Sequence, residues 1–314
     1  MPDFQTIVAA VDAAEPAREI LRLAETLTAA VPGSTRHVLH AVPPIPASLH
    51  ESLFPFACVG DDEDALLAEL REIAARRTAD IVSRHWKGVA AADLVRVANG
   101  TPADTVLELA DGLGPDILLI GSTEGAVRQP GLLGSTAERC LRRARLPILL
   151  VHRSGTPTPR RIAVAVDLTA DSRPLLERAL LLAHGLKAQV LPITVLPHVA
   201  DLDHAGLLPQ GDGVPGRVRK EVEKRMQQQL SQIELPFAVR SGADEQLLPP
   251  VFGVGDPART VLQHAEEAAA DLLVIGRARS GSPVTALGRT AEHVARNSHA
   301  HVLVLPLAAG GGSP

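Results

Sequence analysis

The sequence predicts an α/β protein made of two repeated, doubly wound domains, each a five-stranded parallel sheet with helices on both faces. Three observations lead to this prediction: the length, an internal repeat, and an alternation of strand-like and helix-like patterns. The chain has 314 residues, which at about 150 residues for a typical domain fits two domains. Aromatic residues make up only 2% of the chain, so the cores are expected to consist of Ala, Val, Leu and Ile.

The internal repeat is the strongest of these observations. Sliding the chain by 155 positions superposes residues 7–12 (IVAAVD) on residues 162–167 (IAVAVD). The same shift superposes residues 100–122 on residues 255–277, where 11 of 23 positions are identical. At a shift of 154 the segment GSTAE of the first copy matches GRTAE of the second. Because glycine, proline and aspartate positions match together with apolar ones, two copies of one domain are indicated.

The two copies are separated by residues 153–161 (RSGTPTPRR), a stretch without apolar periodicity. Its proline, glycine and threonine content is typical of a linker. The first domain is therefore predicted to span residues 1–153 and the second residues 160–307.

Apolar runs of strand length alternate with helix-like spacing inside the first copy. Residues 7–11 are fully apolar, whereas Ile20, Leu23, Ala24 and Leu27 share one helix face. Further strands are predicted at 38–42, 94–98, 117–120 and 148–151, and further helices at 61–86, 102–110 and 135–144. Nearly continuous apolar strands alternating with helices are typical of a parallel sheet covered on both faces.

The second copy repeats this order less regularly. Strands are predicted at 163–166, 190–196, 252–254, 272–275 and 302–305, and helices at 176–183, 218–233, 257–265 and 290–297. Pro192 falls inside one of these strands, and Pro249 and Pro250 precede another. Proline supplies no N–H to a ladder, so local distortion is expected there.

Charge and cysteine content argue against several classes of protein. The net charge is -5 without a Lys/Arg block, which disfavours a nucleic-acid surface. Cys58 and Cys140 are the only cysteines and have no CxxC spacing, so neither a disulfide framework nor a zinc knuckle is expected. Residues 1–5 lack a basic signal region, and no apolar run reaches the roughly 20 residues of a membrane span. A cytoplasmic protein without membrane insertion is expected.

Ligands of doubly wound sheets bind beyond the carboxyl ends of the strands. The first strand of each copy ends at Asp12 or Asp167, but neither residue begins a glycine-rich dinucleotide turn, and no P-loop, SGGxDS or HIGH-type signature occurs. No catalytic residue is assigned, and the protein is predicted not to be an enzyme. A hydrolase or nucleotidyl-transferring enzyme of the same broad superfamily is the least favoured alternative.

A glycine-bounded loop follows the fourth strand of the first copy. Residues 121–135 (GSTEGAVRQPGLLGS) end at a predicted helix N-terminus, where free N–H groups and the helix dipole favour anions. Glycine also permits the close backbone approach that a phosphate chain needs. This loop and the strand-terminal aspartate resemble the universal stress protein family, whose nucleotide-binding members carry G-x2-G-x9-G-[S/T] after the fourth strand.

The resemblance covers nearly the whole chain twice, as in tandem members of the family. It implies a stress-response or regulatory protein that binds ATP with Mg²⁺, or another adenine nucleotide, at most weakly and without turnover. It also implies an unidentified protein partner, and pairing of residues 148–151 with residues 302–305 as an internal pseudo-dimer. An uncovered apolar edge strand would favour aggregation, which such pairing prevents.

The resemblance assigns the first-strand aspartate to adenine or ribose, the end of the second strand to a backbone contact, and the glycine loop to the phosphates. In the first copy these groups correspond to Asp12, Ala41, Val42, Gly121, Gly125, Gly134, Ser135 and Thr136. In the second copy they correspond to Asp167, the backbone near Val195 and Leu196, Gly276, Gly288 and Thr290.

Both glycine loops depart from the family pattern. In the first copy Glu124 occupies the second glycine position, with Gly125 one place late, and a carboxylate there would repel phosphate. The second loop is one residue shorter and carries Arg277, Arg279 and Arg289. These arginines either clamp a phosphate or mark a lost site with solvated side chains. The first copy is therefore the expected nucleotide site.

Structural interpretations compete with these functional ones. Asp12 and Asp167 are also placed as ordinary helix N-caps, and Ser135 with Glu138 fits a capping box. The two repeated Gly-x-Pro-Ala segments predict helix starts with proline in the first turn. Cys140 is interpreted as a buried apolar filler rather than a reactive thiol.

Two further alternatives remain open from the sequence. The residues His198, Asp201, Asp203 and His204 can bind a divalent metal chemically, although their spacing matches no strong motif. The whole chain can also be a non-nucleotide interaction or scaffold protein, with vestigial pockets or another anionic ligand.

Overall fold

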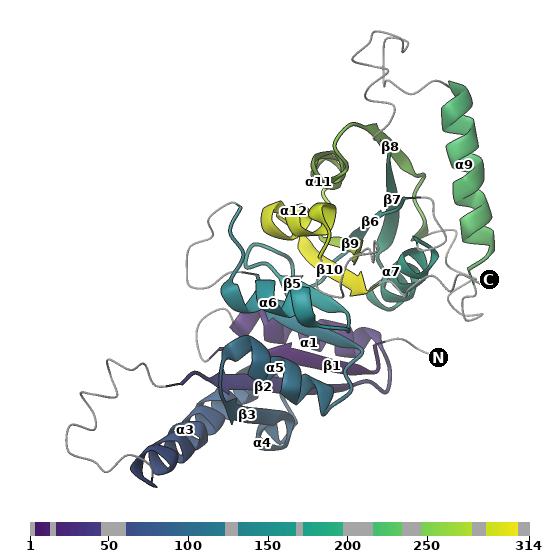
Figure 1. Cartoon of the computed structure of the whole chain (residues 1–314). Helices are drawn as coiled ribbons and strands as arrows, with labels where there is room; N and C mark the ends of the chain where they lie inside the picture. Colours follow the sequence, from purple (N-terminus) through teal and green to yellow (C-terminus); the bar gives the residue numbers. More distant parts are fainter. Residues whose placement is uncertain are drawn as a thin grey trace, which may run out of the picture.

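The computed structural model describes residues 4–12, 17–44, 61–122, 131–167, 172–196, 216–233, 246–277 and 287–306. Ten strands of this part form one continuous sheet in the order β3-β2-β1-β4-β5-β10-β9-β6-β7-β8 (Figure 1). The first half contains β1 (Thr6–Ala10), β2 (Thr35–Val42), β3 (Val95–Asn99), β4 (Ile117–Gly121) and β5 (Ile148–Val151). The second contains β6 (Arg161–Ala165), β7 (Gln189–Leu196), β8 (Val251–Val254), β9 (Leu272–Arg277) and β10 (His301–Pro306).

The helices cover both faces of this sheet, because successive strand residues point to opposite sides. One face carries α1 (Ala17–Ala30), α3 (Asp61–His85), α4 (Ala91–Leu94), α7 (Ser172–Leu186) and α9 (Gly216–Ser231). The other carries α5 (Pro102–Asp111), α6 (Ser135–Arg143), α11 (Pro257–Glu267) and α12 (Arg289–Asn297). The short α4 is the one helix here that the apolar periodicity did not predict. Within the described residues, no helix has the length and apolar content to cross a membrane.

The two halves join through their last strands, as predicted. All pairs within each half are parallel, whereas β5 and β10 pair antiparallel with Leu149 opposite Leu303. Each apolar layer continues across this junction; the layer under α1 and α7, for example, contains both Ile7 and Ile162. The pseudo-dimer therefore has two shared cores rather than two separate ones.

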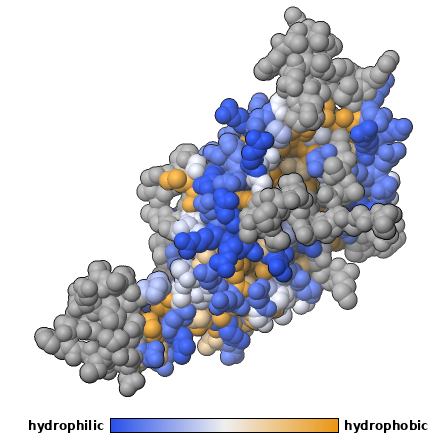
Figure 2. Space-filling view, viewed as in Figure 1, coloured by the Kyte–Doolittle hydropathy of each residue, from blue (hydrophilic) through white to orange (hydrophobic). Residues whose placement is uncertain are grey.

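Helix contacts reinforce the junction on both faces. On one face α1 packs on α7, and a Cβ built on Gly185 would lie 2.4 Å from the carbonyl oxygen of Ala30. On the other face, charged residues of α6 and α12 form a ring in which each arginine contacts both glutamates at 2.9–3.1 Å: Glu138, Arg142, Glu292 and Arg296. The middle of the molecule in Figure 2, where α6 and α12 lie, is accordingly mainly hydrophilic.

The aspartate shared by both repeats before the fourth strand has a structural role. Asp116 Oδ2 accepts a hydrogen bond from Thr6 N–H at 2.8 Å, and Asp271 Oδ2 accepts one from Arg161 N–H at 3.0 Å. In both copies the aspartate N–H also donates back to the same residue's carbonyl oxygen. These reciprocal bonds fix the start of the first strand against the fourth.

The prolines of the second copy meet at one place in the sheet. The N–H of Leu248 donates to Val190 C=O, so Val190 and, by alternation, Pro192 face β8. On that side Pro249 and Pro250 separate the bridge at Leu247 from the start of β8. The prolines, which lack N–H groups, thus lie where the pairing of β7 with β8 is interrupted. This interruption confirms the distortion that was expected there.

Candidate functional site

The carboxyl edge of the first domain brings together several residues predicted to bind nucleotide. Asp12 lies two residues after the end of β1 and is exposed. The buried His40 ring of β2 donates from Nδ1 to the carbonyl oxygen of Val11 at 2.8 Å, which fixes the backbone immediately before Asp12. The strand β4, which ends at Gly121, pairs with β1 on its other side. The aspartate and the start of the glycine loop therefore share one edge.

The end of β2 distinguishes Ala41 from Val42. Because Val11 N–H donates to Leu39 C=O at 2.9 Å, Leu39 and, by alternation, Ala41 direct their backbone groups toward β1 and Asp12. Val42 instead faces β3, and its carbonyl oxygen accepts a hydrogen bond from Gly100 N–H at 2.9 Å. Of the two predicted backbone contacts, Ala41 is the one on the side of the aspartate.

The two ends of the glycine loop are drawn together by backbone hydrogen bonds. Ser122 N–H donates to Val151 C=O at 3.0 Å, and Gly134 N–H donates to Ser122 C=O at 2.9 Å. This closure places the N-terminus of α6, at Ser135, beside the end of β4. Thr136 follows in the first turn of the helix. Glu124 and Gly125 lie outside the described residues.

The capping-box interpretation of Ser135 is wrong. The N-cap of α6 is Gly134, with φ -58° and ψ 143°, and Ser135 is already the first helical residue. Glu138 is consequently too far into the helix to serve as a capping-box partner, and its carboxylate binds Arg142 and Arg296 instead. Partial burial works to raise the pKa of Glu138, but hydrogen bonds and charge from these arginines outweigh it and lower the pKa.

The equivalent aspartate of the second domain is engaged locally. Asp167 is exposed, but its carboxylate accepts a hydrogen bond from the hydroxyl of Ser172, the first residue of α7. The same hydroxyl accepts from Asp167 N–H at 3.0 Å. The first domain has Ala17 at the position of Ser172, so a methyl group replaces this hydroxyl there.

Arg277 is neither a phosphate clamp nor a solvated side chain. It is 8% exposed, and its Nη1 donates at 2.8 Å to the carbonyl oxygen of Leu141, in the last turn of α6 in the first domain. Desolvation lowers the pKa of its guanidinium. The negative end of the helix dipole offsets part of the cost of burying this charge. Of the other two loop arginines, Arg289 is exposed and Arg279 lies outside the described residues.

The remaining second-domain positions differ in backbone conformation. Gly288 caps α12 with φ +79°, a region that favours glycine, whereas its counterpart Gly134 has an ordinary φ. Gly276 lies in β9 and Thr290 in the first turn of α12. Val195 and Leu196 end β7. The arrangement therefore repeats the outline of the first site, but Arg289 replaces the hydroxyl residue that follows the glycine.

Two other sequence interpretations concern metals and thiols. No group of three His, Cys, Asp or Glu side chains able to hold a metal ion occurs in the described part of the chain, and the four residues between 198 and 204 lie outside it. Cys140 is fully buried, and burial raises the pKa of its thiol to about 12. The interpretation of Cys140 as an apolar filler is confirmed.

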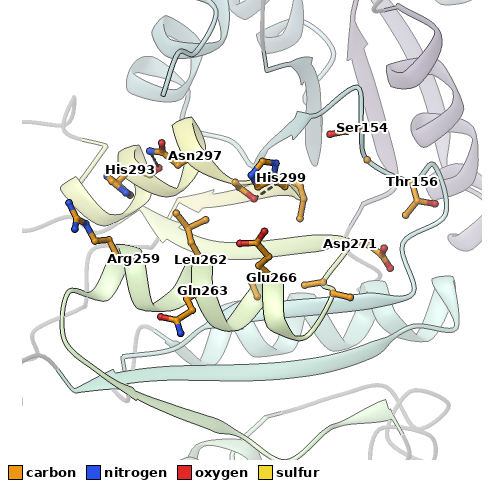
Figure 3. Close-up of a pocket in the computed structure, with 16 residues that line it drawn as sticks. Ser154, Thr156, Arg259, Leu262, Gln263, Glu266, Asp271, His293, Asn297 and His299 are labelled. Atoms are coloured by element: carbon orange, nitrogen blue, oxygen red, sulfur yellow. Dashed lines mark hydrogen bonds between the residues drawn. The ribbon is translucent and has the colours of Figure 1, made fainter. Parts of the chain in front are cut away.

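A groove of about 600 Å³ lies in the second domain, away from the predicted site residues. Figure 3 shows it between α11 and α12, with Glu266 and His299 at its middle and Thr156 of the linker at one end. In the first domain the corresponding helices are bridged by an ion pair between Arg143 and Asp104. The repeat positions of that pair hold Asn297 and Arg259, so no such bridge closes this groove.

Comparison with known proteins bears on this architecture. A model of the universal stress protein family matches the chain twice, at residues 3–152 and 158–306. The chain belongs to this family. Universal stress protein G of Escherichia coli O157:H7 is 33% identical over 151 residues, which are 48% of this chain and 99% of that protein. Universal stress protein G of Shigella flexneri is 34% identical over 115 residues, 37% of this chain and 78% of that protein.

Solved structures of similar length share the fold of this universal stress protein. A universal stress protein from Archaeoglobus fulgidus DSM 4304 aligns with a TM-score of 0.62 and 18% identity, covering 96% of each chain. A functionally unknown protein from Pseudomonas aeruginosa PAO1 aligns with a TM-score of 0.61 and 19% identity, covering 97% of this chain and 93% of that one. The same fold over nearly the whole chain therefore recurs at low sequence identity.

Proposed function

We propose that the first domain binds an adenine nucleotide weakly, without turnover, and that the bound state regulates a protein partner in a stress response. The observation that carries this proposal is the closed glycine loop. The bond from Gly134 N–H to Ser122 C=O presents the N-terminus of α6 at the same edge as Asp12. A helix N-terminus next to a strand-terminal carboxylate suits a ligand with phosphates at one end and hydroxyl groups at the other.

Each described residue of the first site has a role in this proposal. Asp12 would accept hydrogen bonds from ribose hydroxyls or the adenine amino group, and the backbone of Ala41 would contact the base. The N–H groups at Ser135 and Thr136 would face the phosphates. Gly134 has an ordinary φ, so its glycine is not required by conformation but keeps the helix N-terminus open to a ligand.

Mg²⁺ fits this site as part of the nucleotide complex. The described residues contain no cluster of three metal-ligating side chains, so the phosphates themselves would hold the ion. His152, which is hydrogen-bonded to Ser122 at the start of the loop, is 2% exposed, and this burial supports a binding site rather than a hydrolytic one.

The proposal places nucleotide in the first domain and not in the second. The Ser172 hydroxyl donates a hydrogen bond to the carboxylate of Asp167, and the Arg277 side chain is buried against α6. An interaction role with a vestigial pocket, or with another anionic ligand, fits the second domain better for these reasons.

Titration of the full chain with ATP and Mg²⁺ in a calorimeter tests the assignment with a matched pair of variants. We expect Asp12→Ala to abolish or strongly weaken binding and Asp167→Ala to leave it unchanged. Loss of binding only in Asp167→Ala would assign the nucleotide to the second domain. No binding to the unmodified protein, and no nucleotide released from it in mass spectrometry, would favour the vestigial-pocket alternative.

A further inference from the structure

The closed loop of the first domain is one end of a hydrogen-bonded chain that crosses into the second domain. Gly134 N–H donates to Ser122 C=O at 2.9 Å, and Ser122 Oγ lies 3.0 Å from His152 Nδ1. His152 N–H donates to His301 Nδ1 at 3.0 Å. His301 Nε2 lies 2.9 Å from the carbonyl oxygen of Thr156. The chain thus connects the loop, the end of β5, the start of β10 and the linker.

These partners fix the protonation state of His301. Its Nδ1 accepts from a backbone N–H and therefore carries no proton, while Nε2–H donates to a carbonyl oxygen. The ring is 1% exposed, and a Cβ built on Gly155 would lie 2.3 Å from its Cε1. The linker consequently packs directly on the imidazole, and the neutral ring is the only form that satisfies both bonds.

Groups from the end of β5, the linker and the turn before β9 face His301. The charged group that acts on it is Asp271, from the turn before β9. The end of β5 faces it with the backbone N–H of His152, and the linker faces it with the uncharged Gly155 and Thr156. Burial lowers the pKa of His301, and the Thr156 bond and the charge of Asp271 offset part of that effect. The Asp271 carboxylate is itself held by backbone N–H groups of the linker.

This series of hydrogen bonds reaches the glycine loop of the first domain only. The repeat positions of Ser122, His152 and His301 hold Arg277, Pro306 and Pro147, which cannot form the same bonds. The loop that keeps the family spacing is therefore also the loop that is tied to the other domain.

We propose that His301, acting through His152 and Ser122, is a positioning residue for the first-domain ligand site. Ligand binding at this site then depends on a residue of the second domain and weakens in acid. The inference rests on the proposed nucleotide site. A protonated His301 would carry a hydrogen on Nδ1, facing the N–H of His152. The two donors repel, the bond is lost, and the end of β5 no longer holds Ser122 against Gly134.

Hydrogen exchange of the Gly134 amide tests the chain without any ligand. At about pH 7.5, where histidine is neutral, we expect His301→Ala to accelerate this exchange about fivefold, the factor that one hydrogen bond supplies. His301→Asn should retain protection within about twofold, because its Oδ1 can accept from His152 N–H in place of Nδ1. The matched control is His299→Ala, which removes an exposed histidine two positions away. Equal exchange in His301→Ala and the unmodified protein would overturn the proposal.

A pH series of ATP affinity tests the effect on binding. As the pH falls from about 8 to about 4.5, the unmodified protein should lose about fivefold more affinity than His301→Asn. The loss is expected below the ordinary histidine pKa of about 6.5, because burial lowers the pKa of His301. Protonation of ATP itself affects both proteins equally and cancels in this ratio. Parallel pH curves would refute a role for His301. If the unmodified protein binds no ATP at any pH, the nucleotide proposal fails, and the exchange of Gly134 still decides whether His301 positions the loop.

Discussion

Ser122 and Arg277 occupy the same position in the two repeats, yet their side chains reach different parts of the molecule. Ser122 bonds to His152, just after β5 in its own domain, whereas Arg277 crosses to the carbonyl oxygen of Leu141, 136 positions away. The sequence identifies both as loop residues near a strand exit. It cannot predict their partners, because those partners are set by the packing of one domain on the other.

Glu124 carries the prediction at the residue scale that follows most directly from the sequence. At about 4 Å and an effective dielectric near 20, a carboxylate facing one phosphate charge costs about 4 kcal/mol before solvent screening. Even a quarter of this, about 1 kcal/mol, weakens affinity several-fold. Glu124→Gly should therefore tighten ATP binding several-fold and AMP binding less, as measured by calorimetry at low ionic strength. Unchanged ATP affinity would mean that the loop does not approach the phosphates.

At the scale of helices and strands, most of the architecture was predictable. Strands such as 148–151 are short, fully apolar runs, and helices such as α11 begin at a repeated Gly-x-Pro-Ala segment, with Asp256 accepting from Arg259 N–H as the N-cap. The start of α6 at residue 135 was predicted correctly, but its N-cap was placed at Ser135 instead of Gly134. The error arose because Ser-x-x-Glu fits a capping box whether or not the glutamate is needed elsewhere. The interdomain charge ring, which engages Glu138, has no local signal in the sequence.

The contact between α1 and α7 gives a prediction at the element scale. Gly to Ala inside a helix ordinarily stabilises by about 0.5–1 kcal/mol, but a methyl group on Gly185 would lie 2.4 Å from a backbone oxygen of Ala30. Gly185→Ala should therefore lower the free energy of unfolding, by about 1–3 kcal/mol. Gly112→Ala is the control, because Gly112 has a helical φ of -68° and its added methyl group would lie 3.6 Å from Leu109 O, an ordinary van der Waals contact. If denaturant unfolding gave Gly185→Ala a higher free energy of unfolding than Gly112→Ala, α1 and α7 would be able to move apart without cost.

At the scale of the whole molecule, the shared apolar layers predict one cooperative unfolding transition for two family domains. Trp86, the single tryptophan, is buried in the first domain and reports on that half. Its fluorescence and the far-ultraviolet circular dichroism of the whole chain should give the same denaturant midpoint, because neither half can unfold without exposing the other's core. Two separate midpoints would show that the halves are independent.

The antiparallel pairing of β5 with β10 also gives the molecule two dissimilar rims. The carboxyl ends of the first-domain strands and the amino ends of the second-domain strands lie along the same rim, and the other rim has the reverse composition. On the first rim a Cβ built on Gly131, at the end of the glycine loop, would lie 3.9 Å from Asn297 Oδ1, in the wall of the groove between α11 and α12. A macromolecule large enough to cover that loop would therefore touch both repeats at once, and the equivalent carboxyl edges of the two repeats lie on opposite rims.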